Sequence, residues 1–158
     1  MSSKEELIEG FRSVIRQADR VTSGFGEDDW AKPVNDGEGW NRKQTFCHIT
    51  ATAEIAPGFL GSLAGATEND NPMDSIDING LNAQMVAGKE ALSPPDLIKN
   101  LTASYEKLIE FTQGMPQEQL DSKRNFGLLT GGTLSDVMDS VLVLHAIAHI
   151  YSAGGNAA

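Results

Sequence analysis

The chain has 158 residues and a formal net charge of −10, from 12 Lys and Arg against 22 Asp and Glu. This length is typical of one domain with a full hydrophobic core, so we expect residues 1–158 to form a single domain. The acidic balance excludes nucleic acid and anionic lipid surfaces as good partners. Cys47 is the only cysteine and cannot form an intramolecular disulfide. The start, MSSKEELIEG, has no apolar signal core, and no apolar run reaches the roughly 18 residues of a membrane helix. We therefore expect a reduced, soluble, cytoplasmic protein.

The first predicted helix begins at Glu5 and ends near Gly24. Its apolar residues recur every three or four positions, the spacing of a helix with one buried stripe: Leu7, Phe11, Val14, Ala18 and Val21. The segment 26–39, GEDDWAKPVNDGEG, is predicted to be a loop because it is rich in Gly, Asp, Asn and Pro. Trp30 and Val34 are expected to pack inward from it.

The second predicted helix follows Trp40, with Asn41 as its N-cap. Its apolar positions again have helical spacing: Phe46, Ile49, Ala53, Ala56, Leu60 and Leu63. Pro57 lies inside this pattern and removes one backbone hydrogen bond, which predicts a kink or an early end.

Residues 64–80 are rich in Asn, Asp and Gly and form a predicted long connection, followed by a weaker helical pattern from Leu81 to Ala87. The third main helix is expected to begin after the capping residue Ser93, with two prolines in its first turn, and to end at Gly114. Its stripe consists of Leu97, Leu101, Tyr105, Leu108 and Phe111.

Residues 125–132 form another predicted loop, and the last helix runs from Thr133 or Ser135 to Gly154. Its predicted buried stripe is Leu134, Met138, Val141, His145, Ala148 and Ser152. Four main amphipathic helices with little strand signal predict an all-α fold, a four-helix bundle.

The chain contains three histidines, of which His145 and His149 stand at positions i and i+4 of the last helix. Residues at this spacing share a helix face, close enough for both imidazoles to bind one ion. His48 lies on the second helix, beside the stripe of Ile49, and bundle metal sites take ligands from facing helices. Three imidazoles with a fourth position left open are typical of catalytic zinc. The alternatives are a core histidine and a solvent-facing pair without a metal.

The fragments GWNRKQTFCHITATAE and LHAIAHIYSAGG resemble the two signature helices of the DinB-like metal-dependent superfamily. That superfamily includes the N-terminal domain of mycothiol-dependent maleylpyruvate isomerase. Its members place a Trp before the second helix, a His about two turns later, and a His-x-x-x-His or Glu-x-x-x-His on the final helix. Trp40, His48, His145 and His149 match in order and spacing.

The resemblance implies a DinB-like four-helix bundle with a long crossover between helices two and three. It also implies a divalent metal, zinc or nickel, on His48, His145 and His149, and a low-molecular-weight thiol such as mycothiol as a second cofactor. The chain ends just after the last helix, so we expect the extra C-terminal domain of the isomerases to be absent. A homodimer that acts on a small-molecule substrate is plausible for the family.

The expected function is a metal-dependent enzyme, a thiol S-transferase or a related hydrolase. A bound cation would deprotonate a thiol for S-transfer, or a water molecule for hydrolysis. The alternatives are a non-catalytic bundle that binds a metal or small ligand, and a metal-free structural bundle.

Other side chains are weaker candidates. Three carboxylates could orient a ligand imidazole or simply be solvated: Glu54, Asp136 and Asp139. Two tyrosines could supply hydroxyls or only pack: Tyr105 and Tyr151. Three cations could hold a thiol's carboxylate: Arg42, Lys43 and Arg124. Cys47 adjoins His48 but points elsewhere on the helix, so we expect a small buried hydrophobe. Trp40 is expected to pack at the start of the second helix.

Overall fold

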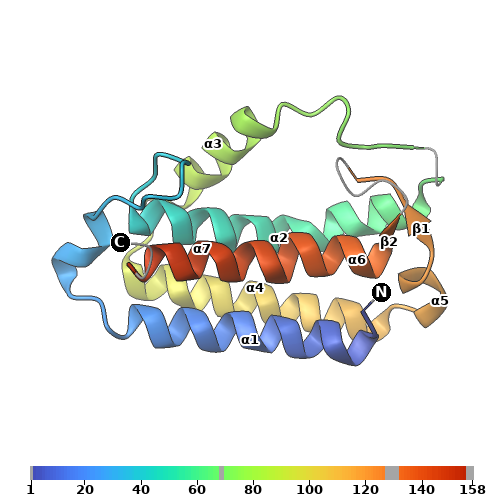
Figure 1. The fold of residues 1–158 in the computed structure, drawn as a ribbon, viewed down its shortest axis with the longest axis horizontal. Helices are drawn as coiled ribbons and strands as arrows, with labels where there is room; N and C mark the ends of the chain where they lie inside the picture. The colour runs from blue at the N-terminus through green and yellow to red at the C-terminus, as the bar shows by residue number, and fades with distance from the viewer. Residues whose placement is uncertain (1, 68–69, 127–131, 156–158) are drawn as a thin grey trace.

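The structure is a computed structural model that describes residues 2–67, 70–126 and 132–155. It is an all-α bundle in which four long helices lie side by side (Figure 1). The four are α1 (Lys4–Thr22), α2 (Arg42–Gly65), α4 (Pro94–Gly114) and a composite last helix, made of α6 (Leu134–Met138), a π-helical segment (Asp139–Leu144) and α7 (His145–Ala153). The all-α four-helix prediction is confirmed.

Shorter elements connect the long helices. The predicted loop 26–39 contains a 3₁₀ helix, Glu27–Ala31, and the crossover from α2 to α4 carries α3 (Ile78–Lys89), which packs along α2 (Figure 1). This helix is longer than the pattern 81–87 indicated. Before the last helix come α5 (Gln117–Leu120) and a small antiparallel pair of strands, β1 (Lys123–Arg124) and β2 (Gly132–Thr133).

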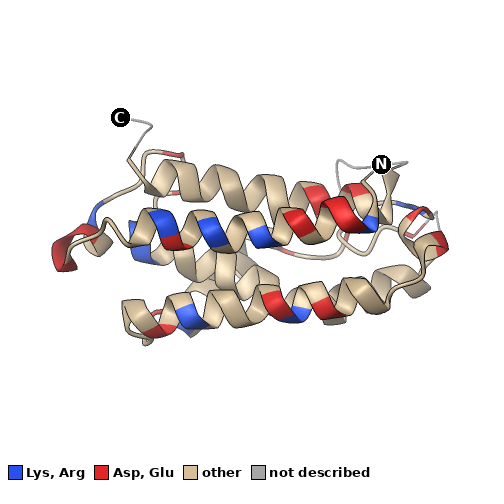
Figure 2. Cartoon of the chain, turned by 90° about the horizontal axis from the view of Figure 1, so that it is seen from below, with Lys and Arg blue, Asp and Glu red and all other residues tan. Residues whose placement is uncertain are grey.

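The core lies between the four long helices, and the predicted stripes of the first three helices supply much of it. Fully buried members include Leu7, Phe11, Phe46, Leu97, Leu101 and Leu108. The first turn of α1 contains Glu5 and Glu6 and its last turn contains Arg20; along the helix, acidic residues predominate toward the N-terminus and basic residues toward the C-terminus (Figure 2). This order complements the helix dipole. A capping box, in which the side chains of Ser3 and Glu6 each accept the other's backbone N–H, fixes the first turn of α1.

Asn41 caps α2 as predicted, because its side chain accepts the backbone N–H of Gln44 at 2.8 Å. The helix then continues through Pro57 to Gly65, so the alternative of an early end is wrong. Leu60 and Leu63, both after the proline, are buried in the core. Their packing outweighs the one hydrogen bond that the proline removes.

The last helix differs from the prediction after Met138. The expected stripe positions are half-buried or exposed: Val141, His145, Ala148 and Ser152. The buried positions are each one residue later: Leu142, Ala146, His149 and Ala153. The π-helical segment explains the shift, because its i to i−5 hydrogen bonding, seen from the His145 N–H to the Ser140 carbonyl, takes in an extra residue.

Tyr105 supports this irregular segment from α4. Its hydroxyl donates to the Leu142 carbonyl at 2.8 Å, and the side chain is buried. Burial raises the pKa of the Tyr105 phenol, so it stays a donor. The π segment is therefore anchored by a neighbouring helix, directly before the residues that form the site described below.

One helix within the described part of the chain, Leu134–Ala153, is long and apolar enough to cross a membrane, with a mean hydropathy of 1.2. The sequence indicated no apolar segment as long as a membrane helix, and that expectation is wrong for this helix. However, 50% of the apolar window is buried inside the bundle, as in the core helix of a soluble protein. The helix is weak evidence for a membrane span.

Candidate metal centre

The three histidines come together between α2 and α7. One nitrogen from each ring lies within 4.8 Å of the others, and the Nε2 atoms of His145 and His149 are 2.9 Å apart. His48 and His149 are buried, whereas His145 is exposed at the edge of the cluster. The rings of His48 and His145 are nearly perpendicular, at 87°, as are those of His48 and His149, at 77°. The arrangement brings three nitrogen donors to one place with one side open to solvent.

Asp36 completes the cluster from the loop before α2, and sequence reasoning missed it. Its Oδ2 lies 3.2 Å from His149 Nδ1, and its side chain is 11% exposed. The other oxygen, Oδ1, accepts the backbone N–H of Glu38 at 3.1 Å. Gly37 and Gly39 adopt positive φ angles of 90° and 77°, which turn the chain tightly here.

The Asp36 contact sets the tautomer of His149. The carboxylate of Asp36 accepts a hydrogen bond from the Nδ1–H of His149, so the proton of the neutral ring stays on Nδ1 and the lone pair of Nε2 is directed at His145. This is the carboxylate–histidine arrangement common at metal sites, in which the outer partner orients the ring and raises its basicity. The only signal in the sequence was an acidic residue in a turn-rich segment, and no periodicity linked it to a residue 113 positions later.

The rings of His48 and His145 are held in the neutral form that a metal ligand needs. Burial, followed by the charges of His149 and His145, lowers the pKa of His48 to about 4. Desolvation by surrounding atoms, and then His149, also lower the pKa of His145. Both imidazoles are therefore unprotonated at neutral pH and able to donate a lone pair.

Two further observations fit a cation in this cluster. His48 Nδ1 is buried and has no hydrogen-bond partner within the described part of the chain, a condition that a bound ion relieves. Trp40 packs its ring against His48, with centroids 4.9 Å apart, and near His149 at 6.3 Å. The indole excludes water from this side, so the residues present suit a divalent ion with imidazole ligands.

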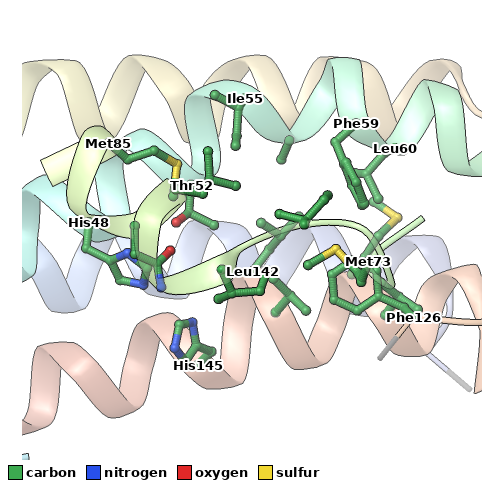
Figure 3. A pocket seen from close by; sticks show the side chains of 18 of the residues that line it. His48, Thr52, Ile55, Phe59, Leu60, Met73, Met85, Phe126, Leu142 and His145 are labelled. Atoms are coloured by element: carbon green, nitrogen blue, oxygen red, sulfur yellow. The ribbon is translucent and has the colours of Figure 1, made fainter. Parts of the chain in front are cut away.

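A cavity of about 400 Å³ opens beside the cluster (Figure 3). His48 and His145 lie at one end, and Phe59, Met73 and Phe126 lie at the other. Residues of α2, the crossover with α3, and the last helix form its walls, including Thr52, Ile55, Leu60, Met85 and Leu142. A molecule in this cavity would contact the histidine cluster directly.

Two of the three carboxylates named as weaker candidates make contacts that stabilise the fold. Asp136 forms a capping box with Thr133 at the start of α6, and Glu54 pairs with Lys89 between α2 and α3. Burial, and then the charges of Asp136 and Glu6, raise the pKa of Asp139, which lies in the π segment. None of the contacts described for the three histidines involves these groups, so the orienting carboxylate is Asp36 instead.

The remaining candidates also lie outside the cavity walls described. Tyr105 is buried, and its hydroxyl donates to the Leu142 carbonyl instead of facing the cavity, whereas Tyr151 is 56% exposed. Cys47 is a buried hydrophobe, as expected, and burial raises its thiol pKa to about 11.

The three cations bind the protein itself. Arg42 stacks over the Phe25 ring at 4.7 Å, Lys43 donates to the Glu90 carbonyl, and Arg124 donates to the Leu63 and Ala64 carbonyls at the end of α2. None is among the described residues that line the cavity.

The fold and the cluster together define a helical bundle with a three-histidine centre built between its second and last helices. The model of one family, described as the mycothiol maleylpyruvate isomerase N-terminal domain, matches residues 11–139. The match covers most of the chain, so the chain belongs to this family, a domain of the DinB-like type. The matched part includes Asp36, Trp40 and His48 but ends before His145 and His149. No curated protein and no solved structure matches the chain.

Proposed function

We propose that the protein is a divalent-metal-dependent enzyme that transfers a low-molecular-weight thiol to an electrophile, with zinc or nickel as its metal. His48, His145 and His149 would hold the ion. The observation that carries the proposal is the orientation of His149 by Asp36, which directs its lone pair into the cluster beside the cavity. A structural bundle without a metal has no need of three buried or half-enclosed imidazoles in this arrangement.

The donor set favours catalysis over storage. Three neutral imidazoles leave a divalent ion its full charge, which supplies a Lewis acid that lowers the pKa of a bound thiol. His145, on the exposed side, leaves the cluster accessible to a thiol from solvent, whereas Trp40 and Asp36 close the inner side. Mycothiol is the thiol that the family description names.

S-transfer fits the cavity better than hydrolysis does. A hydrolase needs a general acid or base beside the attacked atom. The one carboxylate among the described cavity residues is Glu38, which is exposed on the loop. S-transfer to an activated double bond needs no such group beyond the histidine cluster. We place this chemistry in the cytoplasm, where small thiols are kept reduced.

The test combines metal analysis with turnover. Protein purified without an affinity tag should contain close to one zinc or nickel ion per chain, and His149→Ala should lose it. The loaded protein should conjugate mycothiol to an electrophile such as an activated alkene, at a rate that falls to background in His149→Ala. A fully loaded protein that conjugates none of mycothiol, bacillithiol, glutathione or coenzyme A, and hydrolyses no ester or amide, would instead support a non-catalytic binder.

A further inference from the structure

The walls of the cavity carry almost no charge. Most of its described lining consists of aliphatic, aromatic and methionine side chains. The polar members are Glu38, the one carboxylate, with His48, His145, Thr52, Asn79 and Asn82, and the lining contains no lysine or arginine. Three cationic side chains considered above, Arg42, Lys43 and Arg124, contact other protein groups and do not line the cavity. In the metal-free protein, a carboxylate placed inside would lose its hydration without gaining a lysine or arginine partner from the described lining, which disfavours its binding. The net charge of −10 also repels an anionic ligand.

One hydroxyl in the cavity has no hydrogen-bond partner among the described residues. Thr52 follows His48 by one turn on α2, and its Oγ1 is buried without a hydrogen bond within the described part of the chain. On the same helix, the hydroxyls of Thr45 and Thr50 donate to carbonyls four residues earlier. The Thr52 hydroxyl does not, so its donor capacity is unused next to the histidine cluster (Figure 3).

We propose that the cavity selects an uncharged, mainly apolar substrate with a carbonyl group, whose oxygen accepts a hydrogen bond from Thr52 and whose apolar body lies toward Phe59 and Phe126. This inference rests on the proposed thiol transfer and names the substrate class. An α,β-unsaturated ketone fits it. In the addition, a bond forms between the thiol sulfur and the β-carbon, the carbon–carbon double bond becomes single, and the thiol proton ends on the α-carbon, with no leaving group and no redox change.

A matched pair of ligands tests the selectivity without turnover. Benzylideneacetone is an uncharged unsaturated ketone, and cinnamate has the same phenyl-alkene skeleton with a carboxylate. Calorimetric titration of the protein, after chelation of metal and without any thiol, should show the ketone binding at least tenfold more tightly than cinnamate. Equal binding, or tighter binding of cinnamate, would overturn the proposal.

A lysine added at either of two exposed positions, one in the cavity wall and one outside it, tests whether the cavity itself determines the charge selectivity. Ile55 is 46% exposed and lines the cavity, so Ile55→Lys adds a cation to the wall with little effect on the core. This variant should bind the ketone more weakly and cinnamate more tightly. Ala91→Lys adds the same charge at an exposed residue outside the described lining and should leave both affinities unchanged. A matching shift in both variants would show an effect of net charge alone and would contradict a cavity of this selectivity.

Two substitutions, one that removes the Thr52 hydroxyl and one that keeps it, test whether this group binds the carbonyl oxygen. Thr52→Val keeps the shape and should weaken ketone binding about fivefold, whereas Thr52→Ser should retain it. Binding of trans-β-methylstyrene, which lacks the oxygen, should be equal in all three proteins. The infrared carbonyl stretch of the bound ketone should move to higher frequency in Thr52→Val, and an unchanged stretch would remove Thr52 from the proposal. Since no thiol is present, these results do not depend on conjugation: ketone selectivity without conjugation would refute only the proposed enzyme.

Discussion

The contact between Asp36 and His149 predicts the effect of one isosteric substitution, Asp36→Asn, on metal affinity. In the native protein the carboxylate accepts from both the Glu38 N–H and His149 Nδ1–H. If the asparagine oxygen keeps the Glu38 N–H, its amide group presents N–H donors to His149. The His149 ring must then accept a hydrogen bond at Nδ1 and carry its own proton on Nε2. A protonated Nε2 has no lone pair to donate to the ion.

Two estimates of the magnitude agree. Loss of an outer partner of a metal-ligating histidine typically weakens metal binding about 10- to 100-fold, which corresponds to about 1.4–2.7 kcal/mol. A hydrogen bond to a charged group contributes about 1.5–3 kcal/mol when both partners are desolvated. The 11% exposure of the Asp36 side chain and the 8% exposure of His149 place this bond in that class.

The assay is competition for zinc against a chromophoric chelator at pH 7. Asp36→Asn should bind zinc 10- to 100-fold more weakly than the native protein. Asp28→Asn removes the same charge from an exposed position in the same loop and should bind zinc as the native protein does. An affinity of Asp36→Asn within twofold of the native value would refute the argument that Asp36 sets the tautomer of His149.

Three further predictions concern stability. Chelation should lower the melting temperature of the native protein, because an ion held only by the folded state stabilises it, and should leave that of His145→Ala unchanged; an equal shift in the variant would place the metal elsewhere. Tyr105→Phe should cost about 1–3 kcal/mol in urea unfolding, since the buried Leu142 carbonyl loses its donor, and a cost near zero would remove the tyrosine's role in the π segment. The metal-free protein should lose stability as the pH falls from 6.5 toward 4, because the pKa of His48 is about 4 in the folded state and 6.5 when unperturbed, so the unfolded state binds the proton first. The loss assigned to His48 is about 3 kcal/mol, measured as the difference from His48→Gln at pH 7 and pH 4, and equal losses in both proteins would contradict it.

Local rules were enough to predict most of the bundle. The stripes of α1, α2 and α4 and the caps at Asn41 and Ser93 depend on residues a few positions apart, and the structure has them where the sequence indicated. The expectation failed where packing overrides local preference. Buried leucines carry α2 past Pro57, and the π segment moves the buried face of the last helix by one residue.

The three histidines could be singled out because they are few and because helical spacing relates His145 to His149. The prediction that His145 lies in the buried stripe is wrong. Because of the π segment, Ala146 occupies that buried position, His149 is buried as well, and His145 is exposed. Asp36 and the free hydroxyl of Thr52 were beyond sequence reasoning. Both depend on which partners the tertiary fold supplies or withholds, and that information is not periodic.

The separation of the cluster in sequence has a consequence for folding. The bond from Asp36 to His149 joins residues 113 positions apart, and His48 meets its partners only after α7 has docked against α2. Contacts of such long range form late, because closure of a long loop costs entropy before any contact offsets it. The complete three-nitrogen site therefore exists only once the last helix has closed the bundle. During refolding, tight metal binding should therefore appear at the rate at which the last helix docks, and measuring that rate would report the final closure of the bundle.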